Sequence, residues 1–94
     1  MPKHTENALT DRKILNAKSK DKQYKLFDGK GLFIVVHPNG SKYFRWEYTF
    51  DEKRKTLALG VYPQTTLKQA RYERLEAQKL VIDGFDPVEV RRNI

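Results

Sequence analysis

The chain has 94 residues, of which 19 are Lys or Arg and 12 are Asp or Glu, and its formal net charge is +7. This length predicts one small domain around a modest core and leaves little room for a second domain. The positive charge would attract polyanions, but charge alone does not separate DNA from RNA or from an anionic membrane. The absence of cysteine excludes disulfides and thiolate metal sites.

The first residues of the chain are polar and lack the apolar segment of a secretory signal. No segment approaches the roughly 20 apolar residues that are needed to span a bilayer. We therefore expect a cytoplasmic protein without a membrane partner.

A short helical turn is expected within residues 8–17, capped by Thr10 or Asp11. Its apolar side chains should turn inward: Leu9, Ile14 and Leu15. Residues 24–27 favour a short edge strand before a turn at residues 28–31.

Three antiparallel strands are predicted next. Residues 32–37 are rich in β-branched and aromatic side chains and form the first strand. The Asn-Gly pair at 39–40 predicts a tight hairpin turn, because both residue types tolerate positive φ angles. The second strand covers residues 42–50, and a polar turn at residues 51–53 leads to a third strand over residues 54–59.

Side chains of two kinds alternate along the second strand. Aromatic residues occupy every second position and should form the core: Phe44, Trp46, Tyr48 and Phe50. Residues that can hydrogen-bond lie between them: Tyr43, Arg45, Glu47 and Thr49. In the third strand, Leu57 and Leu59 should join the core, whereas Arg54 and Thr56 should lie outside beside Arg45. One face of the sheet is thus predicted to be a core and the other a basic polar surface, a pattern that indicates nucleic-acid binding.

A C-terminal helix is predicted after Pro63, which ends the sheet. Thr66 and Gln69 fit a capping box, and the pairs at 83–84 and 86–87 indicate the end of the helix. One stripe at helical spacing should cover the aromatic face of the sheet: Leu67, Ala70, Arg74, Ala77, Leu80 and Val81. The opposite face should be solvated: Lys68, Arg71, Glu73, Glu76 and Lys79.

These elements predict an α+β fold. It would consist of a three-stranded antiparallel sheet, with room for one short extra edge strand, packed against one C-terminal helix and preceded by a short N-terminal helical turn.

Residues that could support catalysis or bind a metal do not form a recognisable set. His4 and His37 have no partner at metal-ligand spacing. Asp28 and Asp51 fall in turns, where hydrogen bonds to the local backbone explain them. The glycines do not form a phosphate-binding loop before a helix. We expect a binding domain without enzymatic activity, metal or cofactor of its own.

Short segments in a fixed order resemble a known family. They are residues 9–11, 24–28, 31–33, 40–44, 53–55, 57–63, 67–71 and 84–87, of which the most specific is Leu59-Gly60-Val61-Tyr62-Pro63 followed by Ala70-Arg71. Over residues 8–88 the chain closely resembles the N-terminal arm-type DNA-binding domain of P4-like tyrosine recombinases, the integrases of prophages and genomic islands. One departure is Phe44, where the family more often has Trp.

The resemblance implies that residues 1–88 form the arm-type domain and that residues 89–94 begin the linker to a core-binding and catalytic region. It implies a sheet that enters the major groove of arm-type sites. The family's catalytic Arg, His and Tyr lie in a later domain and have no counterpart here. The implied partners are double-stranded DNA, the rest of the integrase, other integrase protomers and accessory DNA-bending proteins.

If the sheet enters the groove, one set of residues should face the bases: Tyr43, Arg45, Glu47, Arg54 and Thr56. Three lysines should lie at the rim for phosphate contacts: Lys42, Lys53 and Lys55. Glu47 would accept a hydrogen bond from cytosine, orient Arg45, or pair with Arg54 across the strands.

Two other functions remain open from the residues. A double-stranded RNA-binding domain has a similar order of elements, but it needs a cationic cluster at the start of its helix, where this chain has only Lys68. A protein-interaction module would use an exposed apolar patch of Phe33, Val35 and Tyr43.

Overall fold

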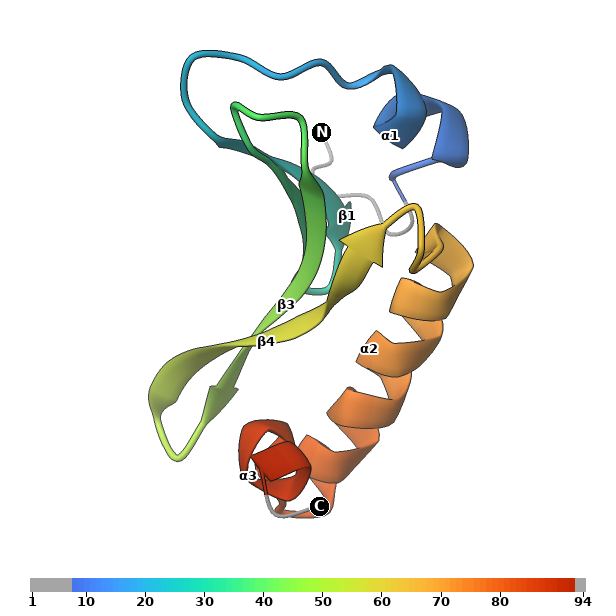
Figure 1. Cartoon of the computed structure of the whole chain (residues 1–94). Coiled ribbons are helices and arrows are strands. Elements are labelled where there is room, and N and C mark those ends of the chain that lie inside the picture. The colour runs from blue at the N-terminus through green and yellow to red at the C-terminus, as the bar shows by residue number, and fades with distance from the viewer. Residues whose placement is uncertain (1–7, 93–94) are drawn as a thin grey trace, which may run out of the picture.

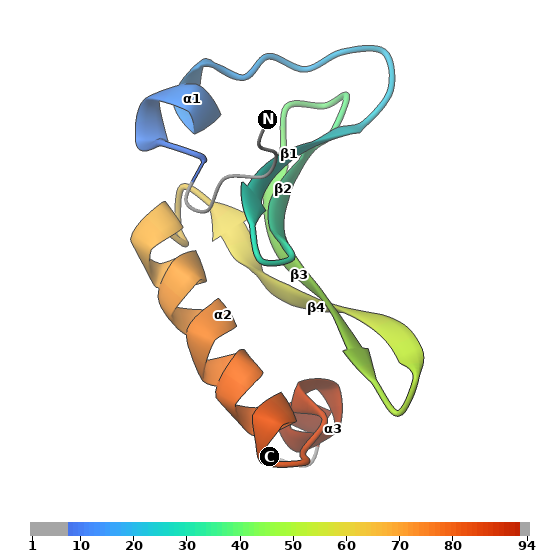
Figure 2. The same cartoon turned by 180° about the vertical axis from the view of Figure 1, so that it is seen from behind.

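The computed structural model describes residues 8–92. Its elements, in chain order, are α1 (Asp11–Asn16), β1 (Tyr24–Gly29), β2 (Leu32–Val36), β3 (Lys42–Phe50), β4 (Lys53–Tyr62), α2 (Leu67–Ile82) and α3 (Pro87–Arg92). The strands form one antiparallel sheet in the order β1-β2-β3-β4. Figures 1 and 2 show the three helices on one side of this sheet, with α2 running along it. The predicted α+β class is confirmed.

The sheet has four strands, because the edge strand for which the sequence left room is present and spans six residues. A second C-terminal helix, α3, was not predicted. The Asp-Pro pair at 86–87 is typical of the end of a helix, but it also suits the start of one. The Asp86 carboxylate accepts a hydrogen bond from the Val88 amide at 3.1 Å, and Pro87 occupies the first helical position, where its missing N–H costs nothing. This helix, Pro87–Arg92, extends across the boundary between residues 88 and 89, where the linker is expected to begin.

Turn residues define the lengths of the strands. The β2–β3 turn falls at the predicted Asn-Gly pair, where Gly40 has a φ of 92° but Asn39 does not have a positive φ. In the β3–β4 turn, Asp51 and Glu52 adopt φ angles of 52° and 64°, which non-glycine residues rarely do. A bulge near the end of β4 pairs Gly60 with Phe44 and Ala58 with Arg45.

The core lies between the sheet and α2. The predicted core residues Phe44, Trp46, Tyr48, Leu57 and Leu59 are all buried there. The α2 residues in contact with them are Leu67, Ala70 and Ala77, as the helical stripe predicted. The Trp46 and Tyr48 rings stack at 4.8 Å. The alternation in the second predicted strand therefore identified the buried face correctly.

The N-terminal segment is joined to the core through α1. Thr10 caps this helix by accepting from the Lys13 amide at 3.1 Å, and Leu9 and Ile14 are buried, as predicted. Leu15 was expected to turn inward but is 68% exposed, because the two turns of α1 present only one side to the core.

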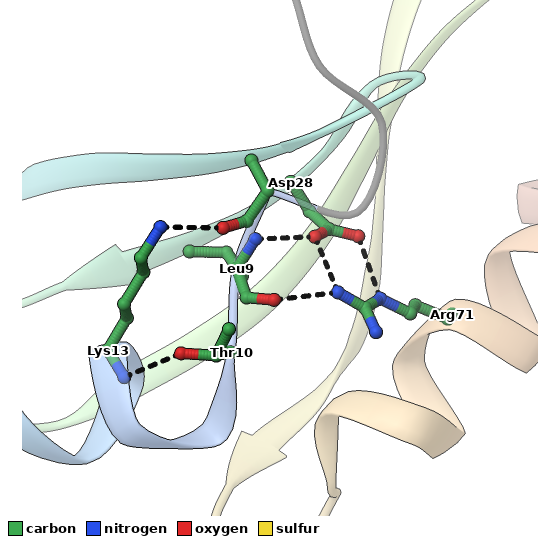
Figure 3. Close-up of polar contacts among 6 residues, drawn as sticks. Leu9, Thr10, Lys13, Asp28 and Arg71 are labelled. Carbon is green, nitrogen blue, oxygen red and sulfur yellow. Dashed lines mark hydrogen bonds and ion pairs between the residues drawn. The ribbon is translucent and has the colours of Figure 1, made fainter.

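Asp28 and Arg71 differ from their predicted roles. Asp28 is not a turn residue bonded to its own backbone: it lies buried in β1 and accepts from the Leu9 amide at 2.8 Å. Arg71 does not belong to a solvated helix face, because it donates two hydrogen bonds to Asp28 and one to the Leu9 carbonyl (Figure 3). Together they attach the N-terminal segment to both β1 and α2.

Candidate nucleic-acid interface

The side chains that alternate with the core residues form the outer face of the sheet. Across β3 and β4, this face pairs Tyr43 with Val61, Arg45 with Ala58, Glu47 with Thr56 and Thr49 with Arg54. Both views show that none of the described helices covers it (Figures 1 and 2). The residues predicted to read bases therefore lie together on one open surface.

The far half of this surface is a two-stranded ribbon. The strand β2 pairs only with Lys42 to Trp46 of β3, so the rest of β3 pairs with β4 alone. The ribbon extends away from β1 and β2 (Figure 2). It carries four polar side chains on its outer face: Glu47, Thr49, Arg54 and Thr56. A two-stranded ribbon is narrow enough to enter a DNA major groove.

The two arginines of the surface have different surroundings. The Arg45 guanidinium lies 5.7 Å from the centre of the Tyr43 ring, an arrangement that stacks a cation on an aromatic face. The Arg54 Nε lies 3.4 Å from a Glu47 carboxylate oxygen, and 79% of the Arg54 side chain is exposed. Glu47 is therefore a cross-strand partner of Arg54, the third of the roles that the sequence left open for it.

The three lysines expected at the rim are not equivalent. Lys53 is exposed next to the β3–β4 turn. The Lys42 ammonium group donates to the Ile14 carbonyl at 2.6 Å and so binds the C-terminal end of α1. The Lys55 ammonium group forms an ion pair with Asp86. Lys42 and Lys55 thus have partners within the protein, on the side of the sheet that faces the helices.

A buried polar cluster holds the ribbon against α3. The Tyr48 hydroxyl donates to Asp86 at 2.6 Å, and Lys55 pairs with the same carboxylate. Burial alone would raise the pKa of Asp86, but the hydrogen bonds from Lys55, Tyr48 and the Val88 amide outweigh it and hold that pKa below its ordinary value. Burial and the hydrogen bond to Asp86 raise the pKa of Tyr48. The ionised carboxylate therefore holds the ribbon at the cross-strand pair of Tyr48 and Lys55.

Beside Arg45, the outer face becomes apolar. Phe33 and Val35 are 4% and 1% exposed, so the apolar patch expected of a protein-interaction module is not available at these two residues. Phe33 is covered by the Phe27 ring at 5.8 Å and by the Lys25 ammonium group at 4.9 Å. Phe27 itself is 61% exposed.

Phe27 is not among the residues predicted to lie on this surface. The signal that could have identified it is the period of two in β1, which puts Lys25 and Phe27 on the side opposite Tyr24 and Leu26.

Within residues 8–92, no group of three His, Asp or Glu side chains is arranged to hold a metal ion. His37 packs edge-on against the Tyr43 ring at 4.8 Å, and His4 lies outside the described residues. None of the described helices has the length and apolar character to cross a membrane.

Comparison of the sequence with known proteins identifies relatives of this chain. The family model of the arm DNA-binding domain matches residues 9–94. Prophage integrase IntZ of Escherichia coli K12 is 44% identical over 90 residues, which are 94% of this chain and 22% of that protein. The integrase of enterobacteria phage P4 is 48% identical over 86 residues, which are 89% of this chain and 20% of that protein. The chain therefore spans about a fifth of the length of these relatives. Its sequence over residues 9–94 shows that the chain belongs to the arm DNA-binding domain family.

Proposed function

We propose that the chain binds double-stranded DNA sequence-specifically at arm-type sites, with the outer face of its sheet in the major groove, as the N-terminal part of a site-specific integrase of the tyrosine recombinase class. The observation that supports this most directly is the open face of β3 and β4, on which Arg45, Glu47, Arg54 and Thr56 lie together. Basic and hydrogen-bonding side chains on a narrow ribbon suit the edges of bases in the groove.

The residues of this surface have distinct proposed roles. Arg45 and Arg54 would donate to guanine, while Glu47 holds Arg54 at 3.4 Å and so restricts its orientation. Tyr43 and Thr56 would make further hydrogen bonds to bases. We assign the phosphate contact to Lys53, since Lys42 and Lys55 would first have to leave their partners within the protein.

The wider function follows from the relatives, which are named as phage and prophage integrases. We propose that this domain guides an integrase that inserts or excises a prophage or genomic island in the bacterial cytoplasm. The chain would act with the rest of the integrase, which would follow the domain formed by residues 1–88. Other integrase protomers and accessory DNA-bending proteins would join the complex. The chemistry of strand cleavage would belong to the rest of the integrase.

Selection from a random duplex library tests the proposal. The chain should enrich one sequence motif, and its affinity should fall steeply with salt. Arg45→Ala and Arg54→Ala should each lose about 1–3 kcal/mol on the selected site and little on random duplex. The matched control is Lys68→Ala with Lys79→Ala on α2, which should change neither affinity; Arg71 is left intact because it holds Asp28.

Two outcomes would contradict this model. If the Lys68 and Lys79 changes abolished binding while both arginine variants bound normally, the helix would be the reading element. Equal affinity for an A-form RNA duplex of the selected sequence would favour the RNA-binding alternative.

A further inference from the structure

Phe27 is an exposed aromatic residue on the outer face of the edge strand β1. The residue is 61% exposed, whereas most Phe residues are buried. The register places Phe27 beside Phe33, and Phe33 beside Arg45, in one row across the sheet. The exposed ring is therefore continuous with the surface proposed to read bases.

The width of the sheet determines where Phe27 would lie on a duplex. Adjacent strands are about 4.8 Å apart, so β1 lies about 10 Å from β3. The major groove of B-DNA is about 12 Å wide, which leaves about 6 Å on either side of its centre. If the middle of the sheet, between β2 and β3, follows the centre of the groove, Arg45 of β3 lies about 2 Å from the centre and β1 lies about 7 Å from it, at one groove wall.

The wall of the major groove presents both an apolar group and negative charge. The C5-methyl group of thymine is the apolar group that bases present in the major groove, and it lies closer to the backbone of its own strand than the O4 atom does. The sugar-phosphate backbone borders the same wall. Lys25, which is exposed on the outer face of β1, would meet this negative charge beside the Phe27 ring.

We propose that Phe27 contacts the C5-methyl group of a thymine at the groove wall, beside the base pair that Arg45 reads. This inference depends on the proposed function. It adds β1 to the DNA-reading surface and gives that surface a preference for thymine over cytosine, which has no methyl group at this position.

The test replaces each thymine of the selected site, one at a time, by deoxyuridine, which lacks only the methyl group. The unmodified chain should bind one of these duplexes about fourfold more weakly, the factor expected for one buried methyl group. Phe27→Ala should bind the thymine and uracil duplexes equally, whereas Phe27→Leu should retain part of the difference. The matched control is Phe85→Ala, which removes a 56% exposed aromatic side chain outside the sheet and should retain the full difference.

The first comparison uses the unmodified chain on substituted DNA, so it does not depend on whether a variant folds. If the unmodified chain binds every deoxyuridine duplex as tightly as the thymine duplex, the inference is overturned. It is also overturned if Phe27→Ala remains fully sensitive to the methyl group, because another residue must then make the contact. In both cases the proposed function stands as long as a motif is selected and the arginine variants lose affinity. Selection of no motif would instead overturn the proposed function.

Discussion

Arg71 of α2 donates two hydrogen bonds to Asp28 of β1. They measure 3.0 Å from Nε to Oδ2 and 2.9 Å from a terminal nitrogen to Oδ1. The same guanidinium donates to the Leu9 carbonyl at 2.8 Å, and Asp28 accepts from the Leu9 amide (Figure 3). The hydrogen bond to Asp28 is the largest cause that raises the pKa of Arg71. The planar guanidinium group of arginine can donate to these three acceptors at once. The single ammonium nitrogen of a lysine cannot form the same pair of parallel hydrogen bonds to a carboxylate.

Arg71→Ala should lower the free energy of unfolding by about 2–3 kcal/mol, because it leaves the Asp28 carboxylate buried without its charged partner. This is less than for a fully buried pair, since 31% of the Arg71 side chain is exposed. The free energy of unfolding of Arg71→Lys should lie between those of the unmodified chain and Arg71→Ala. The control is Lys68→Ala, on the exposed side of α2, which should leave the free energy of unfolding unchanged. Urea unfolding measures all three. A change of less than 1 kcal/mol, roughly one ordinary hydrogen bond, would contradict a stabilising role for the pair.

Asp86 should make the stability of the domain depend on pH in the acid range. Its pKa is lower in the fold than in the unfolded chain, so its contribution is present above the ordinary aspartate pKa of about 3.9 and is lost as the pH falls through the folded pKa. Tyr48→Phe removes one of the hydrogen bonds that lower this pKa and should shift it upward. NMR titration of the Asp86 carboxyl carbon measures this pKa in the unmodified chain and in Tyr48→Phe. Titration of Asp86 at or above the ordinary value in the unmodified chain would refute the prediction.

Substitution of Lys53 should affect DNA binding, whereas substitution of Lys42 should affect stability. Lys53→Ala should leave stability unchanged and reduce the slope of log affinity against log salt by about one unit, because it removes one phosphate contact. Lys42→Ala should leave the slope unchanged and lower the free energy of unfolding by about 1–2 kcal/mol, because the last carbonyls of α1 lose their cationic donor. DNA titrations over a salt series and urea unfolding measure the two effects. The reverse pattern would show that Lys42, not Lys53, contacts the phosphates.

Glu52→Gly should stabilise the domain. Glu52 has a φ of 64° at the exposed tip of the β3–β4 turn, where a side chain costs roughly 1 kcal/mol and glycine costs almost nothing. Glu52→Ala is the matched control, since it removes the same side chain but keeps the Cβ atom and should not stabilise. Thermal unfolding of the two variants gives the comparison. Equal midpoints would mean that the turn relaxes without cost.

The sequence by itself determined the features that depend on neighbouring residues. Alternation at a period of two identified the core face of β3, the Asn-Gly pair identified the β2–β3 turn, and Thr66 with Gln69 identified the start of α2. These patterns are readable because the groups involved lie within four residues of each other, whatever the rest of the chain does. The same alternation brought Arg45, Glu47, Arg54 and Thr56 onto one surface.

Only the tertiary structure decided which charges are free to meet DNA. Arg71 finds its partner 43 residues away, Lys55 finds its partner 31 residues away, and Lys42 binds a carbonyl 28 residues away. A charged side chain looks the same in the sequence whether it faces solvent or a buried acceptor, because its environment depends on which elements pack together. The packing of α2 and α3 against the sheet engages Arg71 and Lys55, the docking of α1 engages Lys42, and Arg45, Arg54 and Lys53 remain on the open side of the sheet or at its exposed tip.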